Sequence, residues 1–305
     1  MGRVTGDYRR AGMMTVMTPV LGAYLLPGDP VWLRSSLARY YALLDDLVVV
    51  VPVPATGWTG RPLPVDECLE IIAAVDVRGI ARQVTGHWED RGEPMRADTA
   101  QRQAGLDALA GRVDWVLQID NDEVLPDPGV IMRAIESAGP DVRGIELPLR
   151  VLYRRLGPRV FAAITGSSGH AVVEYPGSNV VRSGAVLVHA RRPSGHVVRH
   201  VVRGDKESLQ VRRVTDSLVT QVEDLDPSEA ILHNSWGRKP REILRKTRSW
   251  GHASGARGLL YVVTRWWVSR WLWRWQRNLH PFEDGLWPRL RQVTVPPWLL
   301  DERDA

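Results

Sequence analysis

Short apolar runs and amphipathic segments alternate along the first 150 residues of the chain. Apolar runs bounded by Pro, Gly or polar residues predict strands at 20–26, 47–51, 79–84, 114–119 and 144–152. Apolar residues at three- and four-residue spacing predict helices at 30–44, 65–74, 95–110 and 128–138. A chain that alternates strand and helix in this way is expected to form an open, mostly parallel sheet with helices on both faces, which is an α/β fold.

The pattern changes after residue 155. Short β-like pieces at 159–164, 171–174, 180–189 and 196–202 predict antiparallel hairpins added to the edge of the sheet. Residues 203–228 are polar and weakly periodic, so a mobile loop is predicted there, followed by helices at 241–252 and 261–279. We therefore expect a flexible leader (1–17), an α/β domain (18–255) and a helical C-terminal extension (256–305).

The composition is that of an ordinary globular protein, with 44% apolar and 25% charged residues among 305. It excludes collagen-like and coiled-coil chains. The single cysteine, Cys68, excludes an internal disulfide framework and favours a reducing compartment. The sequence has no uninterrupted run of about 18 apolar residues, so no membrane-spanning helix is expected. Residues 11–26 follow two arginines but lack the cleavage site of a secretory signal.

The net charge of +5 is distributed unevenly. Residues 1–230 carry 26 basic and 29 acidic side chains, whereas residues 231–300 carry 13 basic and 3 acidic ones. Within 264–277, five tryptophans alternate with four arginines. Two interpretations of 261–279 stay open: a helix that lies on an anionic membrane surface, or a helix that packs on the domain and extends its arginines to solvent. No nucleic-acid-binding motif accompanies these residues, so no nucleic-acid partner is expected.

Three carboxylates, Asp120, Asp122 and Glu123, directly follow the predicted strand at 114–119. Ligands of open α/β sheets bind at the carboxyl ends of strands, so these side chains are expected to face a crevice. Adjacent carboxylates repel one another, and a hard cation such as Mg²⁺ or Mn²⁺ relieves the repulsion. A turn with a helix cap is the alternative, because Asp and Asn are favoured in both.

The surroundings of this acidic motif resemble the donor-binding region of GT-A-fold glycosyltransferases, in particular family 2-like enzymes. The matching segments are Arg102-Gln-Ala-Gly-Leu-Asp, Asp114-Trp115 and Asp120-Asn121-Asp122-Glu123. The downstream segments Ile231-Leu-His233-Asn-Ser-Trp236, Arg241-Glu-Ile-Leu-Arg-Lys246 and Trp250-Gly-His252 resemble the tail of the same group. The resemblance spans roughly residues 18–255. It implies a nucleotide-sugar-binding half at 18–152 and an acceptor half at 153–255.

The resemblance implies a metal-dependent enzyme that moves a sugar from a nucleotide-diphosphate donor to a hydroxyl of a carbohydrate, lipid-linked or other acceptor. Asp120 would hold the ribose and help bind the metal, which is Mn²⁺ or Mg²⁺. Asp122 and His233 would be further metal ligands. Taken singly, His233 is also typical of an ordinary loop histidine.

Three more residues of the donor site follow from the resemblance. Arg102 and Lys246 would contact the diphosphate, although each is equally typical of a solvated cation on a helix face. Tyr24 lies at the end of the first predicted strand, where the family places the nucleotide base. The family's usual Asn-Glu motif at that strand is missing here.

A transfer that inverts the anomeric carbon needs a carboxylate as general base. We expect this base after residue 165, and the candidates are Glu174, Asp205, Glu207 and Asp216. Asp205 and Glu207 are favoured because they begin the segment predicted to be mobile, which is suited to closing over substrate. Residues 174–179 and 188–192 are candidates for the acceptor pocket.

Other functions stay open. One is a non-catalytic GT-A-like module that binds a membrane or a protein through its tail. Another is a sugar nucleotidyltransferase on a related fold, which would be expected to carry a Gly-rich loop with Arg and Lys after the first strand; residues 24–29 lack one. The irregular spacing of His170, His189, His196 and His200, without a cysteine, disfavours a zinc site. The expected location is the cytoplasm, with attachment to the cytoplasmic face of the membrane as an open alternative.

Overall fold

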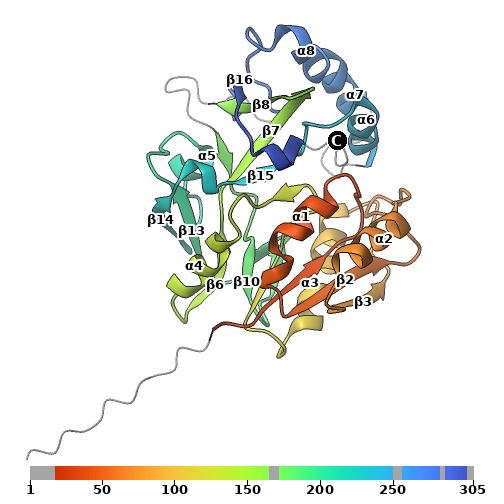
Figure 1. Cartoon of the computed structure of the whole chain (residues 1–305), viewed down its shortest axis with the longest axis vertical. Coiled ribbons are helices and arrows are strands. Elements are labelled where there is room, and N and C mark those ends of the chain that lie inside the picture. The colour runs from red at the N-terminus through yellow and green to blue at the C-terminus, as the bar shows by residue number, and fades with distance from the viewer. Residues whose placement is uncertain (1–17, 165–171, 250–255, 282–285, 301–305) are drawn as a thin grey trace, which may run out of the picture.

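The computed structural model describes residues 18–164, 172–249, 256–281 and 286–300, and every structural statement below refers to these ranges. They form one eight-stranded sheet and a second sheet of six strands. Figure 1 shows helices α1 to α4 around the large sheet and α6 to α8 beside the smaller one.

Four parallel strands form one half of the large sheet, in the order β4-β1-β2-β3, with β3 at the edge. Their bounds are β1 Leu21–Leu25, β2 Asp46–Pro52, β3 Ala81–Gly86 and β4 Trp115–Leu117. The helices between and after them are α1 Leu33–Tyr40 with the 3₁₀ turn η1 Tyr41–Leu43, α2 Val65–Val75, α3 Pro94–Leu109 and α4 Gly129–Ser137. The predicted alternation of strand and helix is confirmed, and the chain has a Rossmann-like α/β fold.

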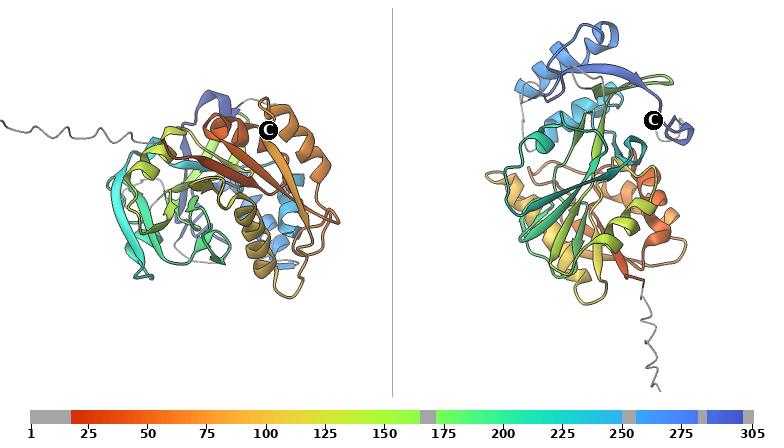
Figure 2. Two further views of the ribbon diagram at one scale, coloured as in Figure 1. Left: turned by 90° about the horizontal axis from the view of Figure 1, so that it is seen from below. Right: turned by 90° about the vertical axis from the view of Figure 1, so that its left-hand side faces the viewer.

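Alternate side chains of the central strands point into two separate cores. Leu47, Val49 and Val51 of β2 pack in the core that contains residues of α1, α2 and α4, whereas Val48 and Val50 pack with residues of α3. A β-branched run that is buried on both faces is typical of a central parallel strand. Helices therefore cover both faces of the sheet, as predicted (Figure 2).

Beyond β4 the large sheet continues with four strands: β10 Val180–Arg182, β6 Val142–Glu146, β13 His196–Val202 and β14 Val219–Leu225. β10 is antiparallel to both of its neighbours, whereas β6, β13 and β14 pair in parallel. The predicted mobile loop at 203–228 is wrong, because it contains α5 Leu209–Arg212 and the edge strand β14. An edge strand keeps one side toward solvent, and the mostly polar sequence of β14 concealed it.

The second sheet has the order β16-β8-β7-β15-β5, with β9 paired to β7. Its strands are β5 Glu123–Val124, β7 Leu149–Leu156, β8 Arg159–Ile164, β9 Val173–Glu174, β15 Ile231–His233 and β16 Arg289–Val293. β15 pairs with β5 in a register that sets His233 opposite Glu123. This pairing makes the downstream histidine a neighbour of the acidic motif. The prediction of antiparallel hairpins at the edge of the sheet is only partly right. β8 and β9 pair antiparallel with β7, but in the second sheet, and β11 Leu187–His189 forms a separate antiparallel pair with β12 Arg192–Pro193. β10 instead lies inside the large sheet, and β13 pairs there in parallel with both of its neighbours.

The Arg/Trp-rich tail is divided into short pieces instead of the one helix predicted at 261–279. The pieces are α7 Ala256–Tyr261, the π-helical turn η3 Val262–Trp266 and α8 Ser269–Leu272. The separate helix predicted at 241–252 occurs as α6 Pro240–Ser249. Two 3₁₀ turns, η2 Pro227–Glu229 and η4 Pro297–Leu300, lie before and after this region. The amide of Trp267 donates to the Val262 carbonyl at 2.7 Å, five residues back, which is the π-helical spacing.

The tryptophans of the tail fall into two groups. Trp266 is fully buried and packs in one cluster with Tyr153, Trp236 and Trp287, whereas Trp271 is 60% exposed. The tail therefore packs on the second sheet and also keeps part of its apolar surface in solvent. Within the described residues, no helix combines the length and apolar character that crossing a bilayer requires. The predicted domain boundaries and halves stay predictions.

Candidate active site

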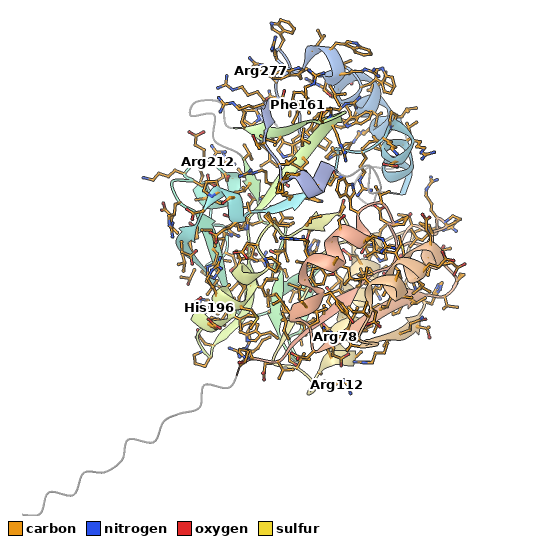
Figure 3. The ribbon with its side chains drawn as sticks, in the orientation of Figure 1. Arg78, Arg112, Phe161, His196, Arg212 and Arg277 are labelled. Carbon is orange, nitrogen blue, oxygen red and sulfur yellow. The ribbon has the colours of Figure 1, made fainter. Side chains whose placement is uncertain are left out.

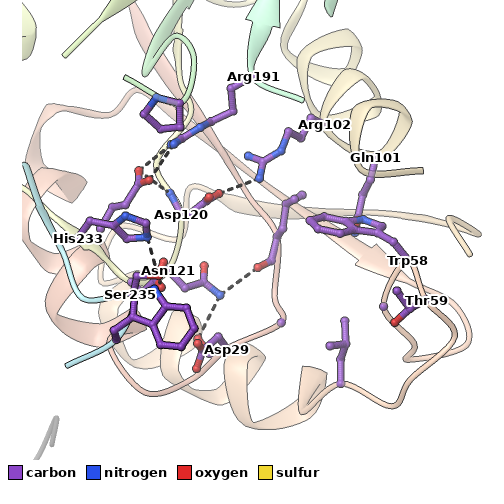
Figure 4. A pocket seen from close by; sticks show the side chains of 18 of the residues that line it. Asp29, Trp58, Thr59, Gln101, Arg102, Asp120, Asn121, Arg191, His233 and Ser235 are labelled. Atoms are coloured by element: carbon purple, nitrogen blue, oxygen red, sulfur yellow. Dashed lines mark hydrogen bonds and ion pairs between the residues drawn. The ribbon is translucent and has the colours of Figure 1, made fainter. Parts of the chain in front are cut away.

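A cavity of about 600 Å³ lies at the carboxyl ends of β1 and β4 (Figure 4). β2 and β3 extend the sheet on one side of β1, and β4 lies on its other side. The loops that leave β1 and β4 therefore diverge, and a crevice opens at this switch point. The walls of the cavity come from these two loops, from α3, from the loop between β2 and α2, and from the second sheet.

Asn121 joins the two loops that form the floor of the cavity. Its side-chain amide donates to the carbonyl oxygens of Leu26 and Asp29 at 3.0 and 3.1 Å. The middle residue of the acidic motif is thus a structural tie. Its neighbours Asp120 and Asp122 line the cavity.

Asp120 forms an ion pair with Arg102. The family resemblance had assigned both residues to the donor site. Arg102 Nη2 lies 3.0 Å from Asp120 Oδ1, and its Nε donates to Asp98 Oδ1 at 2.6 Å. Burial alone would raise the pKa of Asp120, but the nearby Arg102 and Arg191 guanidinium groups outweigh burial and hold the pKa below its usual value. Asp120 is therefore an anion that faces the cavity with a side chain 35% exposed.

Glu123 forms a buried two-pronged ion pair with Arg191. The distances are 2.6 Å from Nη1 to Oε2 and 2.8 Å from Nη2 to Oε1, and both side chains are at most 5% exposed. Arg191 lies in the turn between β11 and β12, where the amide of Ala190 donates to Thr99 Oγ1 of α3 at 2.8 Å. The hairpin thus delivers a guanidinium group to the floor of the cavity, and parallel donors of this kind bind carboxylates strongly.

Asp122 is held by Arg238, which follows β15. Arg238 Nη2 donates to Asp122 Oδ2 at 2.6 Å, its Nη1 bonds Asp29, and its Nε donates to the Asn234 carbonyl at 3.0 Å. His233 Nε2 lies 3.7 Å from the same Asp122 oxygen. The structure thus brings Asp122 and His233 together, with a guanidinium group between Asp122 and Asp29.

These side chains do not fit a divalent cation as they are placed. Among the described residues, no group of three or more His, Cys, Asp or Glu side chains could hold a metal ion. Asp120 and Asp122, the predicted carboxylate ligands, each pair with an arginine. The charge that a metal would neutralise is already balanced, in large part, by guanidinium groups.

One end of the cavity presents an immobilised indole. Trp58 Nε1 donates to Gln101 Oε1 at 2.7 Å, and Gln101 Nε2 donates to the Val50 carbonyl at 3.0 Å. Arg61 is exposed at the same end and forms no ion pair within the described part of the chain. A flat ring beside a cation suits an aromatic group that carries phosphate.

The opposite end combines a carboxylate with aromatic rings. Glu174 Oε1 accepts a hydrogen bond from Trp287 Nε1, and the His280 ring meets Trp287 edge-on with centroids 4.5 Å apart. Burial lowers the pKa of His280 to about 4, so this imidazole is neutral at physiological pH. Trp236 completes this wall.

Tyr24 lies beneath the cavity and does not line it. It is 2% exposed and packs with Val48 and Leu106, and its hydroxyl donates to Gln118 Oε1 at 2.6 Å. Burial raises the pKa of the Tyr24 hydroxyl far above its usual value. The residue supports the floor of the site, and the contact with the nucleotide base predicted for it stays without a structural basis.

The two predicted catalytic carboxylates also lie away from this cavity. Asp205 Oδ1 accepts the backbone amides of Glu207 and Ser208 at 3.1 and 3.0 Å, which caps the turn before α5. Neither Asp205 nor Glu207 lines the cavity, whereas Glu174, another of the candidates, does.

Several sequence-based assignments fall elsewhere. Lys246 belongs to α6, but its side chain is outside the described part of the chain, as are residues 250–252 and His170. His196 bonds Asp141, and His200 bonds Asp224. The role of Lys246 therefore stays a prediction.

Sequence reasoning did not assign Trp58, Arg191 or Arg238 to the donor site. Arg191 fell within a stretch considered for the acceptor pocket, and Arg238 comes only two residues after the His-Ser-Trp block. Proximity to that block was the only available signal for Arg238. Nothing in the local sequence marks Trp58.

Comparisons with known proteins add little to this geometry. No family model matches the chain, and no curated protein matches it significantly. A solved 4-diphosphocytidyl-2C-methyl-D-erythritol synthase is similar with 19% identity over 54% of this chain and 76% of that chain, at a TM-score of 0.31. A mycobacterial protein is similar with 14% identity over 80% and 74%, at a TM-score of 0.35.

A third solved structure, CMP:2-keto-3-deoxy-manno-octonic acid synthetase complexed with CTP, is similar with 9% identity over 75% of this chain and 96% of that chain, at a TM-score of 0.36. Such low identities and TM-scores carry no conclusion about activity. Membership of glycosyltransferase family 2 is not supported by these comparisons. The fold class rests on the strand order and the helices on both faces of the sheet.

Proposed function

We propose that this chain is a nucleotide-sugar-dependent glycosyltransferase that uses the cavity at the β1/β4 switch point. The observation that supports this proposal most is the convergence of Asp120, Arg102 and the fixed indole of Trp58 in one cavity. A nucleotide sugar presents a flat base, anionic phosphates and hydroxyl groups, and these three chemistries match the three side chains.

The donor is oriented by the indole end of the cavity. The base stacks on Trp58, whose ring is held by Gln101. Arg61 and Arg102 meet the phosphates, and Asp120 accepts a hydrogen bond from a ribose hydroxyl. Because Asp120 is ionised, it acts as an acceptor only.

The sugar and the acceptor occupy the opposite end, between Trp236, Trp287 and Glu174. Glu174 acts as general base: it takes the proton of the acceptor hydroxyl as that oxygen attacks the anomeric carbon. The bond from the anomeric carbon to the diphosphate oxygen breaks in the same step, which inverts the carbon. We assign this role to Glu174 instead of Asp205 or Glu207 because, of the carboxylates predicted as the base, Glu174 alone lines the cavity.

Charge on the leaving diphosphate is stabilised by cationic donors of the chain, of which Arg102 is held in place by Asp98 and Asp120. Arg102 faces the cavity from α3, and Arg61 faces it from the loop before α2. Preorganised donors that meet charge where it develops lower the barrier to group transfer. A Mn²⁺ or Mg²⁺ ion is implied by the family resemblance alone, and no step proposed here depends on it.

Sugar nucleotidyl transfer is the second candidate, and the names of two of the similar structures contain a diphosphocytidyl group and CMP. Such an enzyme would bind a triphosphate next to the first strand. The loop after β1 instead carries Asp29, which bonds Arg238, and it has no Lys or Arg in residues 26–30. This arrangement favours glycosyl transfer.

The test is binding followed by product analysis with the full chain. We expect UDP-, GDP- or dTDP-glucose to raise the melting temperature, and we expect Asp120→Asn to weaken binding of that donor by about tenfold in calorimetry, the loss of one charged hydrogen bond. Asp66→Asn, an exposed change on α2, is the matched control and should bind as the wild type does.

Products then separate the two candidates. Release of nucleoside diphosphate from a bound donor indicates glycosyl transfer, whereas release of pyrophosphate from CTP and a sugar phosphate indicates nucleotidyl transfer. A chain that binds no nucleotide sugar and no nucleoside triphosphate contradicts both.

A further inference from the structure

A second cavity, of about 1000 Å³, lies behind Arg238 and is strongly basic. It is formed by the β7–β8 turn, the segment 237–242 and the start of α8. Besides Arg238, five cationic side chains line it: Arg154, Arg155, Arg159, Lys239 and Arg270. Glu242 is the one acidic residue among those that line it. We refer to it as the basic cavity.

Arg154 shows that the positive charge of the basic cavity is not balanced internally. The residue is 4% exposed, its guanidinium carbon lies 3.7 Å from the centre of the Trp266 ring, and its Nε has no hydrogen-bond partner. No carboxylate in the described ranges pairs with it. Buried arginines are nearly always paired, so this one is suited to an anion from outside the chain.

The pKa of Arg154 supports the same interpretation. Burial lowers it to about 10, and the charge of the neighbouring Arg270 contributes to the lowering. The guanidinium therefore remains charged at physiological pH while it lacks a counter-ion. Arg159, Lys239 and Arg270 likewise form no ion pair with a described residue. An anion in the cavity would relieve the mutual repulsion of these groups.

Exposed apolar side chains occur in the helical segments next to the basic cavity. Trp271 lines the cavity and is 60% exposed, and Leu272 and Trp275 next to it are 47% and 70% exposed. Leu260 and Val263, in the preceding α7 and η3, are exposed as well. Figure 1 shows α7 and α8 together at one end of the molecule. Apolar side chains gathered on one surface mark an interaction site, and tryptophan prefers the boundary between water and lipid.

We propose that the basic cavity binds the phosphate of an anionic phospholipid headgroup, while Trp271 and Trp275 enter the interface of the same membrane. A soluble phosphate would explain the arginines of the cavity but not the exposed tryptophans beside them. An anionic phospholipid explains both, because its headgroup binds cations and its acyl region accepts apolar side chains next to the headgroup. The proposal does not depend on the activity of the first cavity.

Co-sedimentation of the full chain with vesicles tests the proposal. We expect binding to vesicles of phosphatidylcholine with phosphatidylglycerol and none to phosphatidylcholine alone. Arg159→Gln and Arg270→Gln should each weaken binding by about fivefold, the effect of one cation at a lipid surface. Trp271→Ala should weaken it at high salt as well, because the tryptophan contribution is not electrostatic. These residues are exposed, so the variants should melt as the wild type does.

Two arginine controls separate a site from diffuse attraction. Arg274→Gln removes the same charge just after α8 but outside the basic cavity, and Arg212→Gln removes it from α5, which Figure 3 places away from the tail. Equal losses in all four arginine variants would show a diffuse basic surface and overturn the site. Inorganic phosphate that stabilises the wild type, together with a chain that stays in the supernatant, would assign the cavity to free phosphate and overturn the lipid.

Discussion

Arg238 decides how the first cavity balances its negative charge. Its side chain is 2% exposed and bonds two carboxylates, Asp29 and Asp122, and the Asn234 carbonyl. Burial alone would lower the pKa of Arg238, but the two carboxylates outweigh burial and hold the pKa above its usual value. The guanidinium therefore stays charged, and Arg238→Met would remove this charge while keeping an apolar side chain.

The cost of Arg238→Met follows from burial. Removing one partner of a buried ion pair destabilises a protein by about 3–5 kcal/mol, because the remaining charge is left without compensation. The side chains of Asp29 and Asp122 are 30% and 12% exposed, so water reaches both of them. We therefore expect about 3 kcal/mol. At about 2–4 °C for each kcal/mol in a domain of this size, Tm falls by about 6–12 °C.

Differential scanning calorimetry measures this loss. Adding Asp122→Asn to Arg238→Met removes one of the freed charges and should recover at least half of the lost Tm. Arg241→Met, an exposed change on α6, is the matched control and should leave Tm within about 1 °C, as is typical of surface changes. A loss below about 1 °C for Arg238→Met would mean that the ion pairs contribute nothing to folding.

The same variant tests the role of a metal. In Arg238→Met, the freed carboxylate of Asp122 lies 3.7 Å from His233 Nε2, and both are ligand types that Mn²⁺ accepts. Mn²⁺ should therefore raise the Tm of the variant and leave that of the wild type unchanged. Equal stabilisation of both proteins would refute the argument, because the ion would then bind in the presence of Arg238.

Three further changes test other parts of the site. The pKa of His280 is about 4 in the folded chain and 6.5 in the unfolded chain, so the unfolded state binds more protons between these pH values. The Tm of the wild type should therefore rise from pH 4.5 to 6.5, and His280→Phe should reduce this rise. Glu174→Gln should lower kcat about 10²–10⁴-fold and leave the donor Kd within twofold of the wild type. If the single-turnover rate of the variant matches that of the wild type, Glu174 is not the general base. Trp58→Ala should weaken nucleotide binding about 5–150-fold by calorimetry, and Trp58→Phe much less; equal affinities would place the base elsewhere.

The parallel core was predictable because its signals are local. The uninterrupted β-branched run at 47–51 is dictated by burial on both faces of a central strand, and it reappears as β2 with near-identical bounds. The apolar run at 114–119 likewise predicted a strand that ends just before the acidic motif. The strand order then fixes where the crevice lies, so the position of the cavity was also within reach of the sequence.

The edge of the sheet and the tail were not predictable in the same way. β14 lies at the edge of the eight-stranded sheet and pairs only with β13, and its polar residues give little apolar signal of their own. The helical wheel of 261–279 assumed 3.6 residues per turn throughout. The structure instead contains a wider π-helical turn at Val262–Trp266, which a single period does not describe.

The charge of the site depends on contacts between residues far apart in sequence. Adjacent carboxylates repel one another, and either a divalent cation or a guanidinium group can neutralise their charge. The spacing of Asp120, Asp122 and Glu123 therefore predicts that a cation is needed but does not say which one. Arg191 lies 68 residues from its partner Glu123, and Arg238 lies 116 residues from its partner Asp122. Both arginines arrive on turns whose positions depend on strand pairing. A relative that kept the acidic motif but had apolar residues in place of these arginines would be expected to need a metal ion.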